Sequence, residues 1–269
     1  MTKYLLALET SGKSGSVSLS WVDPSIESPS QEARVGVGLA EQEIRSKSLD
    51  LDPKWGSAKT LAPAIARLLG EQGLSASHLG AVAVLQGPGS FTGLRVGIAT
   101  AKALSYAVGI PIVALDTLDV IAEQIRDTRS VGSPRCELIA VVDAFRGQSF
   151  CATYRIGEGV CHKTVPTRIV DNEILAGEIL GGRNARERLV AGPSLGKLRE
   201  SFQELVGRSE TNCEDAQAIR WVDSGPKAVT LAQLGWQGWI AGRTSDAFGL
   251  LPNYYRSSAA EEKSGKVSE

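Results

Sequence analysis

Short apolar segments alternate with helical segments along this chain. Residues 81–85 read Ala-Val-Ala-Val-Leu without one polar side chain, and residues 110–115 are equally apolar. A strand without a polar face is typical of a parallel sheet that helices cover on both sides. A helix-period pattern precedes the first of these strands, formed by Leu61, Ile65, Leu68 and Leu69. The alternation predicts α/β architecture.

A strand that ends in an acidic residue occurs once in each half of the chain. Residues 4–8 are apolar and end at Glu9, and after a glycine-bearing turn residues 16–21 alternate polar and apolar side chains. Residues 138–142 are apolar and end at Asp143, and another glycine-bearing turn and strand follow. Each pair predicts a β-hairpin. The repetition predicts two related domains.

We place the first domain at residues 1–110 and the second at 111–256, with the last helix able to pack back on the first domain. Residues 23–34 are rich in Ser, Pro and Glu, which predicts an exposed excursion, and a further strand is expected at 35–39. The small and charged residues 257–269 predict a disordered tail.

The charge balance argues against a protein that binds nucleic acid without a partner protein. The 269 residues carry 29 Lys and Arg against 30 Asp and Glu, a formal net charge of −1. Nucleic-acid binding usually needs a basic excess, because neutralising phosphates supplies most of the affinity. No apolar run approaches the ~20 residues of a membrane span, and the amino-terminal segment does not resemble a signal peptide.

The histidines and cysteines limit the chemistry further. His78 and His162 are the only two histidines, so a metal site built on two neighbouring histidines is excluded. The cysteines include no C-x-x-C pair, and we expect buried or free thiols in a reducing cytoplasm. They are Cys136, Cys151, Cys161 and Cys213.

A glycine-rich loop, Gly-Pro-Gly-Ser-Phe-Thr-Gly-Leu-Arg at residues 87–95, lies between a predicted strand and a predicted helix. Its spacing matches neither the P-loop nor the dinucleotide-binding motif. Backbone N–H groups at such a helix start could bind a phosphate. Alternatively, the loop is a tight turn in which Ser90 or Thr92 caps the helix. Both interpretations stay open.

The helix that follows is rich in small residues. Gly97 and Ala101 lie four residues apart, so one strip of the helix lacks bulky side chains and can approach another helix closely. Packing on the helix's own sheet and packing on a partner are both consistent with this spacing.

A hydrolase interpretation fails. Residues 192–196, Gly-Pro-Ser-Leu-Gly, follow an apolar strand and match the G-x-S-x-G nucleophile turn with Ser194 as nucleophile. That fold requires a histidine after the serine, and none follows Ser194. We therefore expect a structural turn.

Several of these segments together resemble the bacterial TsaB (YeaZ) family. The most specific is the nonapeptide at residues 87–95 with the Val-Gly-Ile-Ala that follows it. The others are residues 8–11 with 16–19, residues 142–144 with Gly147, and residues 252–256.

The resemblance implies the actin-like, sugar-kinase-like (ASKHA) fold of two similar α/β domains. It also implies a role in making threonylcarbamoyladenosine in tRNA, where a threonylcarbamoyl group passes from an adenylate to the adenosine just 3′ of the anticodon. In that system the paralogue TsaD holds the metal and is the catalyst, and the ATPase TsaE joins the complex. By this resemblance the chain is not an enzyme alone and requires no cofactor, although ATP or ADP could bind at the complex interface. It would reach tRNA through the complex, and a homodimer is left open.

The family resemblance also implies a docking surface. The first two helices, here residues 60–71 and 94–108, would form a four-helix bundle with the partner's helices. The chain departs from the family at residues 57–59, Ser-Ala-Lys, at Glu9 and at Phe145. The interface candidates are Leu61, Ile65, Leu68, Gly97, Ala101 and Ser105.

The rival hypothesis is a stand-alone actin-fold ATPase or small-molecule kinase. It needs acids at both phosphate turns, which Glu9 and Asp143 could supply. The candidate phosphate-site residues are Glu9, Thr10, Ser11, Gly87, Gly89, Ser90, Thr92, Gly93 and Asp143. A third hypothesis is a protease, but no serine or cysteine has a nearby histidine base that the sequence identifies.

Overall fold

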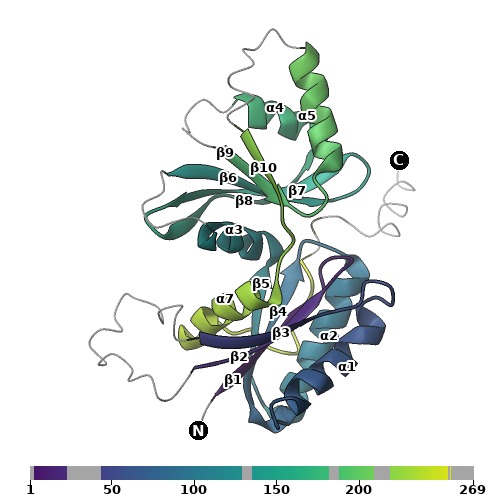
Figure 1. Ribbon diagram of the computed structural model, residues 1–269, viewed down its shortest axis with the longest axis vertical. Coiled ribbons are helices and arrows are strands. Elements are labelled where there is room, and N and C mark those ends of the chain that lie inside the picture. Colours follow the sequence, from purple (N-terminus) through teal and green to yellow (C-terminus); the bar gives the residue numbers. More distant parts are fainter. Residues whose placement is uncertain are drawn as a thin grey trace, which may run out of the picture. The chain divides into compact units, whose positions relative to one another are not determined.

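The computed structural model describes residues 3–22, 44–128, 135–181, 188–208, 219–253 and 255. The chain divides into two compact units. The first is Met1–Gln124 with Gly225–Pro252, and the second is Ile125–Ser224 with Asn253–Glu269. Each unit is built on one five-stranded sheet (Figure 1).

The sheet of the first unit has the strand order β3-β2-β1-β4-β5. β1 pairs antiparallel with β2, and β2 with β3, whereas β4 runs parallel to both β1 and β5. The bounds are β1 Tyr4–Glu9, β2 Ser16–Val22, β3 Ile44–Asp50, β4 Leu79–Gly87 and β5 Ile112–Asp116.

Alternate side chains of β1 enter two different cores of this unit. Leu6 and Leu8 pack in the core that includes the buried residues of α1 and α2, whereas Leu5 and Ala7 pack in the core that includes α7. The sheet is therefore buried on both faces, which is why β1 and β4 are almost continuously apolar. The helices are α1 Ser57–Gly70, α2 Phe91–Val108, α3 Thr117–Asp127 and α7 Ala228–Ile240, with a short 3₁₀ helix, η3, at Ala76–His78.

The second unit repeats this topology. Its sheet has the order β10-β9-β6-β7-β8, with β6, β7 and β8 antiparallel and β9 parallel to both β6 and β10. β6 thus corresponds to β1, and β9 to β4. The bounds are β6 Cys136–Asp143, β7 Gln148–Gly157, β8 Val160–Asp171, β9 Arg188–Gly192, β10 Ile219–Asp223, α4 Asn172–Gly181 and α5 Gly196–Arg208.

The predicted α/β architecture, both hairpins and the duplication are confirmed. The boundary differs from the expected residue 110, because β5 pairs with β4 and extends the first unit to Gln124. The structure also places α7 in the first unit. Residues 23–34, 35–39 and 257–269 lie outside the described residues.

Two findings concern the membrane and the thiols. Among the described helices, none is long and apolar enough to cross a bilayer. Cys136, Cys151 and Cys161 carry free thiols, as expected, and Cys213 lies outside the described part of the chain.

Candidate functional site

The β1–β2 turn and the glycine-rich loop are in direct contact. The backbone N–H of Ser90 donates to the carbonyl oxygen of Ser11 at 2.7 Å. The hydroxyl of Thr10 donates to the carbonyl oxygen of Gly93 at 2.8 Å. These two bonds join predicted site residues that lie about eighty positions apart in the sequence and hold the start of α2 against the end of β1.

The glycines of the loop allow this contact. A Cβ atom at Gly89 would lie 2.6 Å from the carbonyl oxygen of Ser11. A Cβ at Gly93 would collide with the carbonyl of Thr10, and one at Gly97 with the Thr10 hydroxyl. The spacing of these glycines therefore reflects the close approach of two backbone segments.

The loop also supplies the N-cap of α2. The hydroxyl of Ser90 accepts from the N–H of Gly93 at 3.2 Å, so Ser90 is the N-cap, as one of the two interpretations predicted. Thr92 is exposed on the first turn, and Gly87 ends β4 with φ 118°. Since the N–H groups of Ser90 and Gly93 are used within the protein and the β1–β2 turn fills the space beside them, the geometry favours a structural turn over a phosphate cradle.

Glu9 is buried and turned toward its own backbone. The side chain is 1% exposed, and its Oε1 accepts from the Ser11 N–H at 2.7 Å and from the Ser11 hydroxyl at 2.8 Å. Burial raises the pKa of Glu9 to about 7, and the two bonds from Ser11 offset part of that rise. An acid that orients a nucleotide-bound metal must present its carboxylate to that ligand. Glu9 presents it to Ser11, so this turn does not fit a metal nucleotide.

Asp143 belongs to the second unit, where it ends β6. Its Oδ1 accepts from the N–H of Phe145 at 2.8 Å and thereby shapes the β6–β7 turn. Phe145 and Arg146 have φ of 60° and 55°, and the Phe145 side chain is 67% exposed. In the part of the chain that the structure describes, no group of three His, Cys, Asp or Glu side chains could hold a metal ion.

Five of the six interface candidates on α1 and α2 are buried, and Ser105 is half-buried. Leu61, Ile65 and Leu68 are at most 7% exposed and pack in the core under the helices. Gly97 and Ala101 are buried too, and Ser105 donates to the carbonyl of Ile110 at 2.5 Å. Gly97 meets Thr10 and Val84 of β4, so this part of α2 packs inside the first unit, and the assignment of the six residues to an interface stays a prediction.

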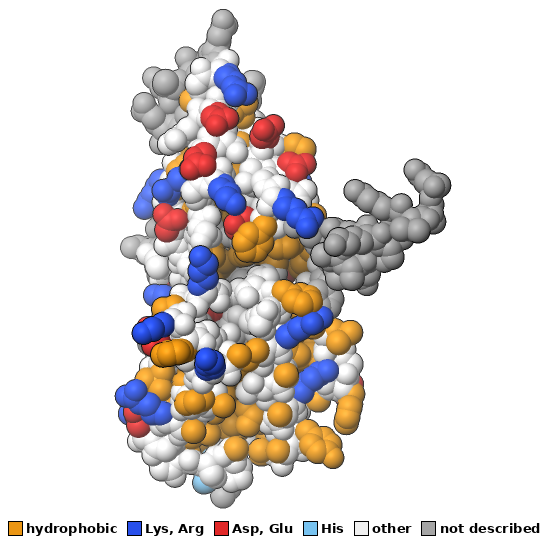
Figure 2. All heavy atoms as spheres, turned by 90° about the vertical axis from the view of Figure 1, so that its right-hand side faces the viewer, with side chains coloured by type: hydrophobic (Ala, Val, Ile, Leu, Met, Phe, Trp, Pro, Cys, Tyr) orange, Lys and Arg blue, Asp and Glu red, His pale blue; other side chains and the backbone are white. Residues whose placement is uncertain are grey.

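The outer surface of the same helices carries small apolar side chains instead. We call the exposed alanines of α1 and α2 the alanine face; they are Ala58, Ala62, Ala66, Ala99, Ala103 and Ala107. Figure 2 shows hydrophobic side chains gathered over this part of the first unit. Tyr106, which is 80% exposed, lies on α2. Within each helix these alanines are four residues apart, which places them on one side of the helix. The sequence shows this spacing once the larger apolar residues are assigned to the core.

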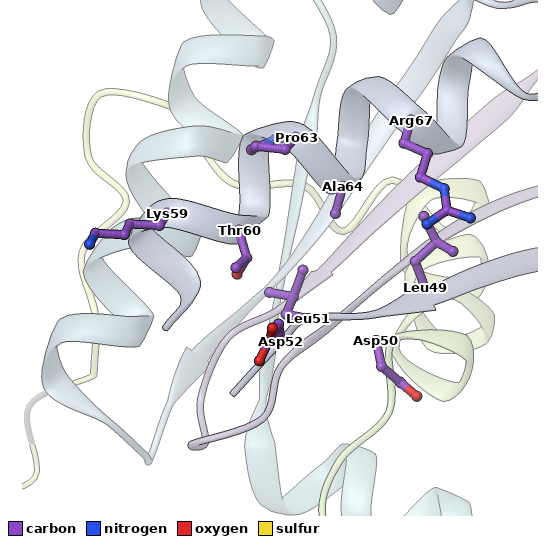
Figure 3. A pocket seen from close by; sticks show the side chains of 9 residues that line it. All are labelled: Leu49, Asp50, Leu51, Asp52, Lys59, Thr60, Pro63, Ala64 and Arg67. Carbon is purple, nitrogen blue, oxygen red and sulfur yellow. The ribbon is translucent and has the colours of Figure 1, made fainter. Parts of the chain in front are cut away.

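A cavity of about 280 Å³ lies beside α1 (Figure 3). Apolar side chains of β3 and α1 line it together with Asp50, Asp52, Lys59 and Arg67. It contains none of the residues that the sequence analysis proposed for a phosphate site.

The G-x-S-x-G segment forms the predicted turn between β9 and α5. Ser194 is exposed there with φ 64°, and a Cβ at Gly192 would collide with the carbonyl of Val141.

The two histidines lie on different elements. His78 lies in η3, where its Nδ1 accepts from the N–H of Ser75 at 3.1 Å. His162 lies on β8, paired in register with Arg155 of β7.

The amino-acid sequence is similar to proteins of tRNA threonylcarbamoyladenosine synthesis. The family model described as TsaD, tRNA N6-adenosine threonylcarbamoyltransferase, matches residues 56–191, just over half of the chain. The TsaB tRNA threonylcarbamoyladenosine biosynthesis protein of Bacillus subtilis is 29% identical over 75% of this chain and 80% of its own length. The Escherichia coli TsaB protein is 25% identical over 76% of this chain and 82% of its own length.

Two solved structures superpose on nearly the whole chain. YeaZ from Pseudomonas aeruginosa superposes with a TM-score of 0.66 at 25% identity and covers 94% of this chain and 99% of its own. A second Pseudomonas aeruginosa structure, described as similar to peptidase YeaZ, has a TM-score of 0.68 at 24% identity and covers 94% and 100%. With the duplicated sheet, they establish the actin-like fold. The chain therefore belongs to the TsaB (YeaZ) family, within the wider family of the tRNA threonylcarbamoyltransferase TsaD.

Proposed function

We propose that this chain is a non-catalytic subunit for the synthesis of threonylcarbamoyladenosine in tRNA. In this role it binds a catalytic TsaD paralogue and works with the ATPase TsaE. The observation that carries the proposal is the similarity to two TsaB biosynthesis proteins over three quarters of the chain.

The contact between the β1–β2 turn and the glycine-rich loop supports a non-catalytic role. Glu9, the acid of the first turn, is 1% exposed and engaged with Ser11. A general acid, general base or metal ligand must reach the reacting atoms. A residue held in this way contributes to the structure of the turn, and the chemistry then falls to the partner, which also holds the metal.

The alanine face supports a docking role. Small side chains allow the axes of two packed helices to approach closely, which increases the contact between them. The TsaD family model begins to match at residue 56, next to the start of α1. A partner of that family thus has a corresponding helix pair, and we propose that the two pairs dock on each other.

The charge of the chain supports an indirect contact with tRNA. The formal net charge of −1 gives no overall attraction to a polyanion. We propose that the complex, mainly through TsaD, supplies the tRNA contacts. ATP or ADP would bind at an interface of the complex rather than between the glycine-rich loop and the β1–β2 turn.

Size-exclusion chromatography with the TsaD protein of the same organism tests the docking role. We expect the two chains to co-elute as a complex that TsaE joins. Separate elution at micromolar concentrations would contradict it.

Calorimetry with ATP and magnesium tests the rival hypothesis of a stand-alone ATPase or small-molecule kinase. The isolated chain should show neither tight binding of ATP nor turnover. Turnover by the chain alone would support an ATPase or kinase.

A further inference from the structure

β3 forms one edge of the first sheet, whose strand order is β3-β2-β1-β4-β5. Within the part of the chain that the structure describes, β3 pairs with β2 alone. Five of its seven side chains are exposed and none is buried. An exposed edge strand presents unpaired backbone N–H and C=O groups, to which another extended segment can bond.

The register of β2 and β3 shows which backbone groups of β3 face this edge. The N–H of Leu51 donates to the carbonyl oxygen of Gly15 at 2.8 Å, just beyond the end of β3 and in the same register. In an antiparallel pair, bonded and non-bonded residue pairs alternate along each strand. The odd-numbered residues of β3 therefore turn their N–H and C=O groups toward β2, and the residues between them turn theirs to the edge. These are Ser46, Ser48 and Asp50.

The cavity beside α1 lies between that helix and β3 (Figure 3). Leu49 and Leu51 line it from the strand, and the side chains of Thr60 and Ala64 on α1 point toward them. Its volume of about 280 Å³ accommodates an aliphatic side chain. Every second side chain of a strand added to β3 would lie on the same side of the sheet as Leu49, where it can enter this cavity.

Exposed lysines lie on either side of the cavity. Lys59 lines it near the start of α1, and Lys47 lies on the same face of β3 as Leu49, because side chains two positions apart on a strand share a face. The ammonium of Lys59 lies 5.3 Å from the centre of the Trp55 ring. A ring orients a cation without cancelling its charge. Both lysines therefore attract an anionic segment at this edge.

The acids near the cavity do not balance these lysines. Glu71 pairs with Arg67, the other cation that lines the cavity, at 2.7 Å. Asp50 points away from α1 (Figure 3). Asp52 accepts the backbone N–H of Lys54 at 2.8 Å in the turn after β3. The cavity therefore has a surplus of positive charge around it.

We propose that β3 and α1 bind an extended acidic segment of another protein, which joins the first sheet as an additional strand antiparallel to β3. An aliphatic side chain of the segment enters the cavity opposite Leu49, and carboxylates two positions before and after it lie near Lys47 and Lys59. Backbone bonds hold the segment, and the cavity and the lysines select its sequence. The residues of α1 that line the cavity are not those of the alanine face, so this site goes beyond the proposed docking of TsaD and is tested without it.

Calorimetry with short synthetic peptides tests the selection. The probe is acetylated and amidated Glu-Thr-Val-Thr-Glu, titrated into the full chain at low salt. We expect it to bind about tenfold or more tightly than Lys-Thr-Val-Thr-Lys, because the two lysines attract its carboxylates and repel the cations of the second peptide. Failure of the first peptide to bind at millimolar concentration, or equal affinity of both peptides, would overturn the proposal.

N-methylation of the same probe tests strand addition. With Val opposite Leu49, the N–H groups of both Thr bond to the edge of β3, and that of Val points to solvent. N-methylation of both Thr should weaken binding about tenfold or more, because it removes two hydrogen bonds. N-methylation of Val should change the affinity by less than about twofold, because its N–H has no partner in the sheet. Equal losses for the two modified peptides would contradict the additional strand.

Variants of the chain test the location. Ser48→Pro removes an N–H that faces the edge and keeps the bonds to β2, so it should weaken binding of the Glu peptide about tenfold or more, whereas Ser48→Ala should bind it like the wild type. Lys47→Glu combined with Lys59→Glu should reverse the preference between the two peptides. Lys197→Glu, exposed on α5 of the second unit, is the matched control and should keep it. With circular dichroism equal to that of the wild type, full binding by Ser48→Pro or an unchanged preference after the double reversal would overturn the proposal.

Discussion

At the residue scale, the buried carboxyl of Glu9 connects the structure of the first unit to the pH dependence of its stability. The carboxyl is buried at the end of β1, and Ser11, which binds it, also accepts the N–H of Ser90 in the loop before α2. The protonation of one side chain is thus connected to the contact that holds the start of α2. This makes Glu9 the place where pH should act on the first unit.

The first prediction concerns pH and stability. Burial raises the pKa of Glu9 from 4.5 to about 7, so the folded chain keeps this proton where the unfolded chain has lost it. The free energy of unfolding should therefore fall as pH rises through this range, by up to about 3 kcal/mol from this group. Urea unfolding at a series of pH values measures it.

Glu9→Gln is the control for this titration. Its amide oxygen can accept the same two bonds from Ser11 but does not titrate, so the decline between about pH 5 and pH 7.5 should be smaller by the share of Glu9. Equal pH dependence in the two proteins would show that Glu9 does not titrate there.

The second prediction concerns the loop glycines. Gly93→Ala should lower the free energy of unfolding by about 3 kcal/mol or more, because its Cβ would collide with the backbone carbonyl of Thr10. Gly70→Ala, at the end of α1 with nothing within 4 Å of the added atom, is the matched control and should be neutral or slightly stabilising. Comparable urea midpoints for the two variants would contradict the packing role of Gly93.

The sequence predicted the members of this residue cluster but not its purpose. The turn at residues 9–11 and the loop at 87–95 are recognisable as loops between strands and helices. Whether their glycines face a phosphate or another backbone depends on contacts over about eighty residues of sequence, which spacing does not contain. The burial of Glu9 is hidden for the same reason.

At the element scale, α1 and α2 each have two apolar stripes. The stripe of large residues, including Leu61 and Leu68, packs in the core, and the alanines form the opposite surface. The sequence predicted both helices, but small residues on both sides of α2 leave the periodicity ambiguous. Substitutions at Gly97 or Ala101 would therefore test folding, whereas substitutions at the alanine face test docking.

The third prediction concerns those alanines. Ala62→Trp and Ala103→Trp should each weaken binding to TsaD about tenfold or more, because a bulky ring prevents the close approach of two helix pairs. Surface substitutions of this kind should leave the stability of the chain within about 0.5 kcal/mol. Isothermal titration calorimetry gives the affinities.

Ile240→Trp provides the comparison. Ile240 is 61% exposed at the end of α7, and α7 packs in the core opposite that of α1 and α2. This variant should bind TsaD like the wild type. If it and Ala103→Trp lose equal affinity, the docking surface lies elsewhere.

At the scale of the whole molecule, two sheets with the same strand order account for the fold of two similar α/β units. The hairpins and the apolar strands predicted this duplication, because their patterns depend on local sequence. The extent of the first unit was not predictable from local patterns: β5 joins by pairing with β4, and α7 returns from beyond the second unit. Both depend on tertiary contacts that the residue pattern allows but does not specify.

The most direct test of the central claim is a reconstituted modification assay. The chain, TsaD and TsaE would be incubated singly and together with unmodified tRNA and threonylcarbamoyl adenylate, and threonylcarbamoyladenosine measured by mass spectrometry of the nucleosides. We predict no product with this chain alone and product that depends on this chain when TsaD and TsaE are present. Modification by this chain alone, or equal product when it is left out, would contradict the account.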